Sequence, residues 1–195
     1  VGDGGDAGFV SKDLLGARVA ANRREYITDL IDDLPTLQGR LGDPQFVGSK
    51  VYPKLLKTAA ESGRAQSIRS LQATDRFLPG YDETSDLKFE VCAPVREEVD
   101  GVSGLRWFDD PGKTKNGHSI VLRLVYHDVR ILLGGDLNAD AESYLLGHYS
   151  GLDAASDDAT VQETIVAQAG ATFGADVAKA CHHGSADFTD LFLRT

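Results

Sequence analysis

The 195-residue sequence has no methionine, only two cysteines, and no apolar run of membrane-spanning length. A membrane-spanning helix needs about 20 predominantly apolar residues, and residues 1–10 lack the basic and apolar regions of a signal peptide. We therefore expect a soluble protein and favour a cytoplasmic location. Because methionine is absent, we expect the first residues, VGDGGDAGFV, to be a processed end or the edge of a fragment.

Basic residues are also scarce, because 20 Lys and Arg face 30 Asp and Glu, giving a net charge of −10. This balance argues against a broad electropositive surface that holds nucleic-acid backbones. A phosphate substrate is still compatible with it, since bound metal ions supply local positive charge. Nucleic acid is thus a possible partner that the charge does not support. Cys92 and Cys181 lie in apolar runs, which indicates two buried thiols rather than a disulfide.

The region 1–86 is predicted to be mainly helical. Apolar residues at helical spacing predict a helix over 26–34, which Pro35 would end. A second helix is predicted over 52–63 and a weaker third one over 65–72. No motif in the sequence explains the function of these helices.

The region 87–195 alternates strand and helix patterns. Residues 97–117 are predicted to form a long loop because Gly, Asp and Lys dominate there. The other predicted elements are strands over 87–95, 119–126, 129–136 and 175–181, and helices from residue 138, over 160–169 and over 186–193. The two strands over 119–136 are close enough to form a hairpin. The order predicts a single α+β domain over 1–195.

The segment GGDLN, residues 134–138, places Asp136 directly after a predicted strand. The two glycines let the backbone approach whatever the carboxylate holds, because no side chain stands in the way. The alternative is that Asp136 or Asn138 caps the helix that follows.

The segment CHHGS, residues 181–185, ends the last predicted strand on two histidines. Imidazole is a common ligand of borderline metals, and a strand end holds it rigidly. With a period of two, His182 and His183 would point to opposite sides, one to a metal and the other to substrate or a carboxylate. The alternative is a helix-capping Ser185 preceded by two histidines without a special role.

The segment NGHS, residues 116–119, lies at the start of the first hairpin strand, and Asp136 lies at the end of its antiparallel partner. Both ends then share one rim of the sheet. We expect Asp136, His118 or Asn116, and one of the two late histidines to reach one cleft. The alternative for His118 is an ordinary loop histidine.

In this order, the three motifs resemble the second half of a metallo-β-lactamase-fold hydrolase. The resemblance covers roughly residues 116–188 and is nearest to the hydrolase domain of bacterial competence DNA-uptake proteins. It implies a four-layer αββα sandwich, and a site with two metal ions, most often zinc, with manganese possible. The implied activity is metal-dependent hydrolysis, with phosphodiester or related ester substrates.

The resemblance also assigns roles to single residues. Asp136 matches the aspartate that bridges the metal ions, and one of His182 and His183 matches the late metal-binding histidine. His118 is a possible further ligand, with Asn116 as its competitor. The histidine that binds no metal would contact the leaving group or the developing oxyanion.

A second group of residues would touch the substrate or orient the metal ligands. It comprises Asn116, Ser119, Glu142 and Ser185. Glu142 matches the acidic residue that follows the GD pair, and we expect it to orient its neighbours rather than bind metal.

The sequence departs from this family at both ends. The H-x-H-x-D-H stretch that supplies most metal ligands occurs nowhere in the 195 residues, and no final strand follows HHGS. We expect a hydrolase domain truncated at both ends, inactive as the isolated chain because a zinc site needs three or four protein ligands. The alternative is a catalytically inactive relative that acts as a binding module through the 97–117 loop and the helical region 13–72.

Overall fold

A computed structural model describes residues 16–47 and 51–195, so the signal-peptide prediction for residues 1–10 lies outside the described residues. The fold is α+β, as predicted, with two four-stranded sheets. The chain divides into two compact units, the first comprising Val1–Ser70 and Glu97–Gly112 and the second Leu71–Arg96 and Lys113–Thr195. No helix in the described ranges is long and apolar enough to cross a membrane.

The first unit contains a sheet with strand order β1-β2-β5-β4, in which all neighbours are antiparallel. The strands are β1 (Arg18–Ala21), β2 (Arg24–Ile27), β4 (Glu97–Val99) and β5 (Val102–Arg106). A half-buried polar network joins them, because the Tyr26 hydroxyl donates to the Glu97 carboxylate at 3.1 Å and Arg106 pairs with the same carboxylate at 2.9 Å. Strands β1 and β2 lie within the region predicted to be mainly helical.

The helix predicted over 26–34 is wrong. Tyr26 and Ile27 end β2, and helix α1 (Leu34–Gly42) begins only at Leu34. The Asp33 carboxylate accepts a hydrogen bond from the Thr36 amide at 2.7 Å, which caps the helix. Proline fits the first turn of a helix because that turn needs no amide donor. Pro35 therefore marks the start of a helix and not the end of one.

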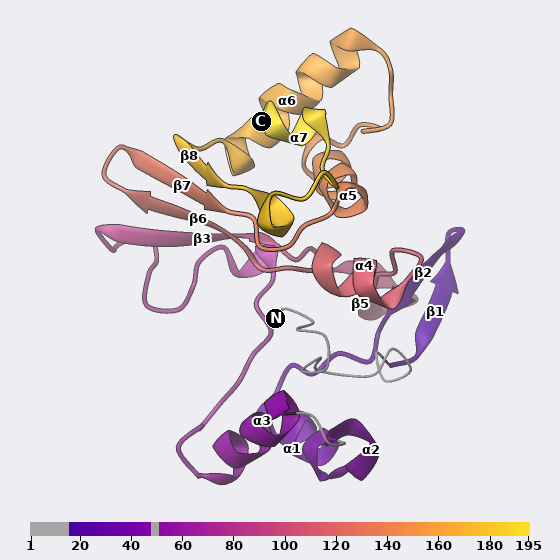
Figure 1. The fold of residues 1–195 in the computed structure, drawn as a ribbon, viewed down its shortest axis with the longest axis vertical. Helices are drawn as coiled ribbons and strands as arrows, with labels where there is room; N and C mark the ends of the chain where they lie inside the picture. The colour runs from indigo at the N-terminus through magenta and orange to yellow at the C-terminus, as the bar shows by residue number, and fades with distance from the viewer. Residues whose placement is uncertain (1–15, 48–50) are drawn as a thin grey trace. The chain divides into compact units, whose positions relative to one another are not determined.

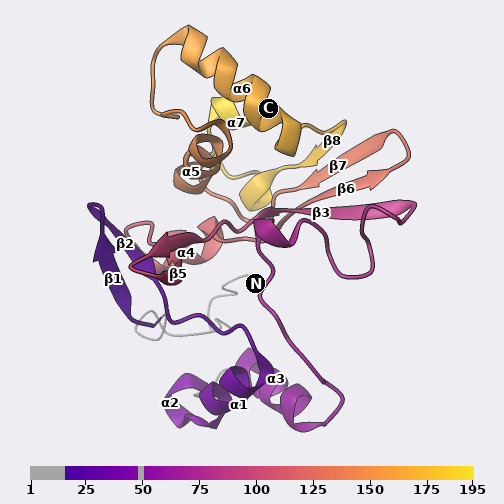
Figure 2. The ribbon, with the colours of Figure 1, turned by 180° about the vertical axis from the view of Figure 1, so that it is seen from behind.

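Two further helices complete the first unit, α2 (Pro44–Val47) and α3 (Val51–Glu61). The latter confirms the helix predicted over 52–63. Helices α1, α2 and α3 lie together in Figures 1 and 2 and enclose a small apolar cluster. Its buried members are Leu37, Leu41, Phe46 and Ala60.

Two other predictions are wrong. No helix forms over 65–72. The short 3-10 turn η3 (Ala73–Asp75) comes directly after this segment. The 97–117 segment is not a loop, because it contains the β4–β5 hairpin and helix α4 (Pro111–Gly117). Asp100 and Gly101, with φ of 50° and 79°, form the two-residue hairpin turn. An Asp-Gly pair between two valines is a strong hairpin signal, which outweighs the polar composition around it.

The sheet of the second unit has the order β3-β6-β7-β8. Its strands are β3 (Leu87–Ala93), β6 (Val121–Tyr126), β7 (Val129–Leu133) and β8 (Val177–Lys179). The predicted hairpin is confirmed as β6 and β7, whereas β8 pairs with β7 in parallel. A parallel neighbour needs a long crossover connection, which helices α5 and α6 provide.

Helices α5 (Ala139–Ser150), α6 (Ala159–Phe173) and α7 (Asp190–Leu193) cover one face of this sheet (Figures 1 and 2). The Asn138 side chain caps α5 by accepting from the Ala141 amide at 3.1 Å. The core between helices and sheet is mostly apolar, and its most buried side chains include Val121, Leu137, Leu145, Leu146, Ile165 and Phe173.

Candidate functional site

The parallel pairing of β7 and β8 brings the GGDLN and CHHGS segments together. Leu133, the last residue of β7, is paired with Lys179, the last residue of β8. The carboxyl ends of two adjacent parallel strands lie at the same edge of a sheet, so the segments that follow them meet there. The His182 amide donates to the Gly135 carbonyl at 3.1 Å and joins the two segments directly.

The side chains of Asp136 and His183 are in contact at this edge. His183 Nε2 lies 3.3 Å from Asp136 Oδ1, with side-chain exposures of 78% and 25% respectively. Two donors bound at about 2.0–2.1 Å to one tetrahedral zinc ion stand about 3.3 Å apart. The pair therefore has the chemistry and spacing of two zinc ligands, and it forms an ion pair when His183 is protonated.

The histidines do not lie on a strand. Strand β8 ends at Lys179, and His182 and His183 lie in the 3-10 turn η4 (Cys181–Gly184) with φ of 46° and 55°. The prediction that they alternate across a strand is wrong, because the chain leaves the sheet before it reaches them. Left-handed backbone costs about 1–2 kcal/mol for each non-glycine residue. Such strain is concentrated at functional sites.

His182 is half-buried, and its role differs from that of His183. Its Nδ1 atom is fully buried and has no hydrogen-bond partner among the described residues. A buried nitrogen that lacks a partner costs about 1–3 kcal/mol. This nitrogen is a second imidazole nitrogen at the same edge of the sheet as the Asp136–His183 pair.

The glycine pair before Asp136 is required by close packing. Gly135 has φ of 62°, and a Cβ atom placed there would lie 2.7 Å from the Ser119 Cβ. A Cβ atom at Gly134 would overlap the Cys181 sulfur. The Ser119 hydroxyl accepts a hydrogen bond from the Asp136 amide at 3.0 Å. This bond confirms that the start of the first hairpin strand and the end of its partner share one rim.

Asn116 and Gly117 of the NGHS segment form the end of α4, and His118 follows in a turn, so these residues are not at the mouth of a strand. Asn116 is in the last turn of this helix, and its carbonyl accepts from the Ser119 amide at 3.0 Å. The His118 amide donates to the Thr114 carbonyl at 3.2 Å, which continues the helical pattern. In the described ranges His118 does not join Asp136 and His183 in a group of three metal-binding side chains.

Glu142 is buried within α5, with 1% of its surface exposed. Its carboxylate accepts from the Thr189 amide at 2.6 Å and from the Thr189 hydroxyl at 3.0 Å. Burial raises the pKa of Glu142, and the two hydrogen bonds oppose this rise. Through these two hydrogen bonds, Glu142 orients the start of α7. The alternative in which Ser185 caps a helix is wrong, since Thr189 caps α7, while Ser185 accepts from the Asp187 amide at 3.2 Å.

The sequence did not predict a role for Lys179, which lies near the site. The Lys179 ammonium donates to the carbonyls of Ala180 and Gly135, at 3.1 and 3.4 Å, so a positive charge lies beside the Asp136 loop. The one signal for Lys179 in the sequence is that it is the single charged residue in the run AKAC. The buried Asn138 amide also donates to the Lys113 carbonyl at 2.9 Å, which ties the α5 cap to α4.

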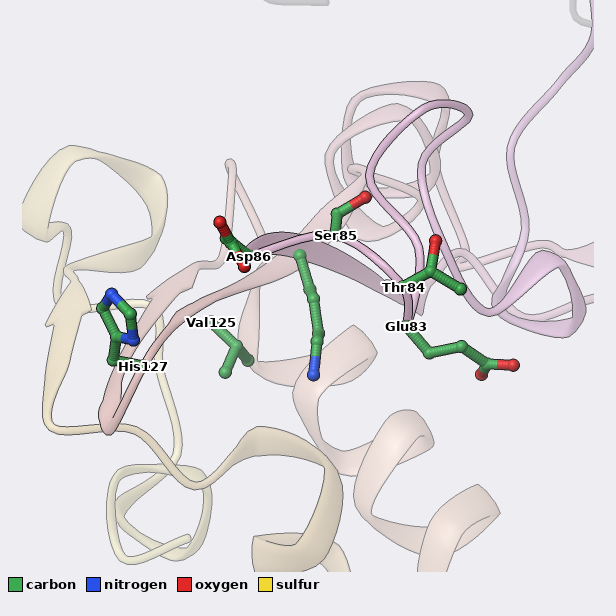
Figure 3. A pocket seen from close by; sticks show the side chains of 7 residues that line it. Glu83, Thr84, Ser85, Asp86, Val125 and His127 are labelled. Atoms are coloured by element: carbon green, nitrogen blue, oxygen red, sulfur yellow. The ribbon is translucent and has the colours of Figure 1, made fainter.

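A separate polar pocket lies at the opposite end of the sheet, with a volume of about 310 Å³. Figure 3 shows Glu83 and His127 at opposite ends of it, and the Glu83 carboxylate points away from Asp86. These groups diverge, so they offer no common point for a cation.

The two cysteines are free thiols, as predicted. Within the part of the chain that the structure describes, no group of three or more His, Cys, Asp or Glu side chains is arranged to hold a metal ion. No family model, no curated protein and no solved structure matches this chain.

Proposed function

We propose that this chain is part of a metal-dependent hydrolase of the metallo-β-lactamase type, acting on phosphodiester or related ester substrates. The observation that carries the proposal is the contact of 3.3 Å between His183 and Asp136. These residues are 47 positions apart, on two segments whose sequences predict metal binding. The strained turn that carries both histidines supports the same conclusion.

The residues present fit part of a zinc site. Asp136 and His183 would hold one ion, and the Nδ1 of His182 is a second imidazole nitrogen nearby in the chain. Bound zinc or manganese would lower the pKa of a water molecule to about 7 and polarise the electrophile. The described residues supply fewer than the three or four ligands of a complete site, so the other ligands would come from the H-x-H-x-D-H motif of a longer protein.

The roles of the chain's own residues follow from their surroundings. The Ser119 hydroxyl fixes the Asp136 loop through the Asp136 amide. The His183 side chain is 78% exposed, so an ion entering from solvent can reach it. The Lys179 ammonium, held beside Gly135, would attract an anionic substrate to this edge of the sheet.

The apolar pattern of the second-unit sheet supports the sandwich architecture. Leu132 and Ala178 line a cavity together with Phe173 of α6, so they face the helices. Successive strand residues alternate between faces, and the opposite face therefore presents the cross-strand row Phe89, Leu124, Ile131 and Val177. A sheet with an apolar row on the face that its own helices do not cover is expected to have a further layer over that face.

Elemental analysis of bound metal tests the proposal. We would compare the 195-residue chain with a version that includes its natural upstream sequence, each as wild type, Asp136→Ala and, as a control, Asp157→Ala on an exposed loop. The expected result is about two zinc or manganese ions in the longer wild type and in its Asp157 variant, with loss in the Asp136 variant. The metal-loaded protein should then hydrolyse bis(p-nitrophenyl) phosphate.

Two results would overturn this proposal. Metal that stays bound in Asp136→Ala would assign it to other residues. Absence of metal from both wild-type proteins would favour the alternative, a catalytically inactive relative that acts as a binding module.

A further inference from the structure

A second cavity lies between the sheet and the helices of the second unit, and Lys179 is the one lining residue to which the proposed hydrolase mechanism gives a role. Its volume is about 370 Å³, within the size range of small-molecule sites. Apolar side chains from three elements form most of its walls, among them Leu132 of β7, Phe173 of α6 and Phe192 of α7. The rings of Phe173 and Phe192 lie 5.0 Å apart between centroids.

The Glu142 carboxylate is the acidic side chain among the residues that line this cavity. Glu142 lines the cavity although only 1% of its surface is exposed to solvent. Its hydrogen bonds run to Thr189 through one oxygen, Oε2. Across the described ranges no Lys, Arg or His side chain forms an ion pair with Glu142. A buried carboxylate without a cation is unfavourable, and a positive charge placed beside it is stabilised.

The charges near the cavity also favour a cation. The neighbouring Asp187 carboxylate adds to the rise of the Glu142 pKa, after the larger effect of burial. Lys179 is the opposing charge in the lining, but it is exposed and its ammonium is directed to the carbonyls of Ala180 and Gly135. The interior of the cavity therefore combines an apolar wall with an uncompensated negative group.

We propose that this cavity binds a small primary amine with an apolar body, its ammonium paired with Glu142 and its hydrocarbon packed against Phe173 and Phe192. The apolar walls bury the apolar body of the ligand, and the Glu142 carboxylate favours a positively charged ligand. This inference does not depend on metal binding or hydrolysis, because none of the lining groups belongs to the Asp136–His183 pair.

Isothermal titration calorimetry at pH 7 with three ligands of similar size tests the inference. The ligands are 2-phenylethylamine, 3-phenylpropanoate and the neutral 2-phenylethanol. We expect the amine to bind most tightly to the wild-type protein. Glu142→Gln keeps an oxygen that accepts from Thr189 and should weaken amine binding at least tenfold. Binding of 2-phenylethanol should stay unchanged in this variant, which shows that the cavity is intact.

Further variants separate the two charges in the lining. Lys179→Met removes the opposing charge, so we expect it to strengthen amine binding. Lys88→Met, a matched variant outside this cavity, should leave binding unchanged. Ala178→Phe fills the cavity from β8 and should abolish binding of all three ligands.

Three results would overturn the inference. If Glu142→Gln binds the amine as tightly as the wild type does, Glu142 does not hold the ammonium group. Preference for 3-phenylpropanoate, lost in Lys179→Met, would make the cavity an acid site. A wild-type protein that binds none of the three ligands would not use this cavity for small molecules of this class.

Discussion

Replacing Gly135 by alanine should destabilise the second unit more than an ordinary glycine substitution does. The residue has φ of 62°, a backbone conformation that costs about 1–2 kcal/mol for a residue with a Cβ atom. The new methyl group would also lie 2.7 Å from the Ser119 Cβ. Forced overpacking of this kind costs roughly 1–3 kcal/mol. The sum predicts a loss of about 2–5 kcal/mol for Gly135→Ala.

Two matched variants separate the backbone cost from the steric cost. Gly80 has φ of 86°, and a Cβ atom placed there would meet no other atom within 4 Å. Gly80→Ala should therefore lose only the backbone share, about 1–2 kcal/mol. Ser119→Gly removes the atoms that the methyl group at residue 135 would meet. In a double-mutant cycle it should recover the steric share, about 1–3 kcal/mol.

Urea unfolding followed by far-UV circular dichroism measures these differences. Helices α5 and α6 belong to the second unit and give a signal for it. The single tryptophan, Trp107, lies in the first unit, so its fluorescence is a control that should not change. If Gly135→Ala is no more destabilising than Gly80→Ala, the close approach of the Asp136 loop to Ser119 does not restrict position 135 to glycine.

Three further outcomes are expected. Asn138→Ala removes a helix cap and a buried hydrogen bond, and should lower the free energy of unfolding by about 1–3 kcal/mol in the same urea assay. Burial raises the pKa of Glu142, so its ionisation opposes folding. Thermal unfolding should therefore show wild type losing stability relative to Glu142→Gln as pH rises through the ordinary carboxyl pKa, with no further change above the raised pKa. Burial raises the pKa of Cys181 to about 11 and that of Cys92 to about 12, so a thiol reagent at pH 8 should modify Cys181 slowly and Cys92 more slowly still. Modification of Cys92 first would contradict this order.

The hairpin of the second unit could be predicted because its signal is local. Residues 121–133 are rich in branched apolar side chains and contain a short turn at His127 and Asp128. Helix α5 was predictable for a similar reason, since Asn138 is a preferred capping residue and acidic residues follow it in the first turn.

Helical spacing over 26–34 gave a wrong prediction because periodicity does not decide which partner a segment finds. Tyr26 and Ile27 pair with Arg106 and Leu105, about eighty residues away along the chain. Such a partner can override local preference. The Asp-Gly turn at 100–101 was available in the sequence, but the polar composition around it favoured a loop.

The sequence by itself determined which chemical groups stand at the candidate site. It placed a carboxylate after two glycines, and two histidines before a glycine, at the ends of apolar runs. Only the tertiary structure decided that His183 contacts Asp136 and that the histidines lie on a strained turn, because both depend on the parallel pairing of β7 with β8. The burial of the Glu142 carboxylate could likewise not be read from the sequence, since burial is a property of the packed helices around it.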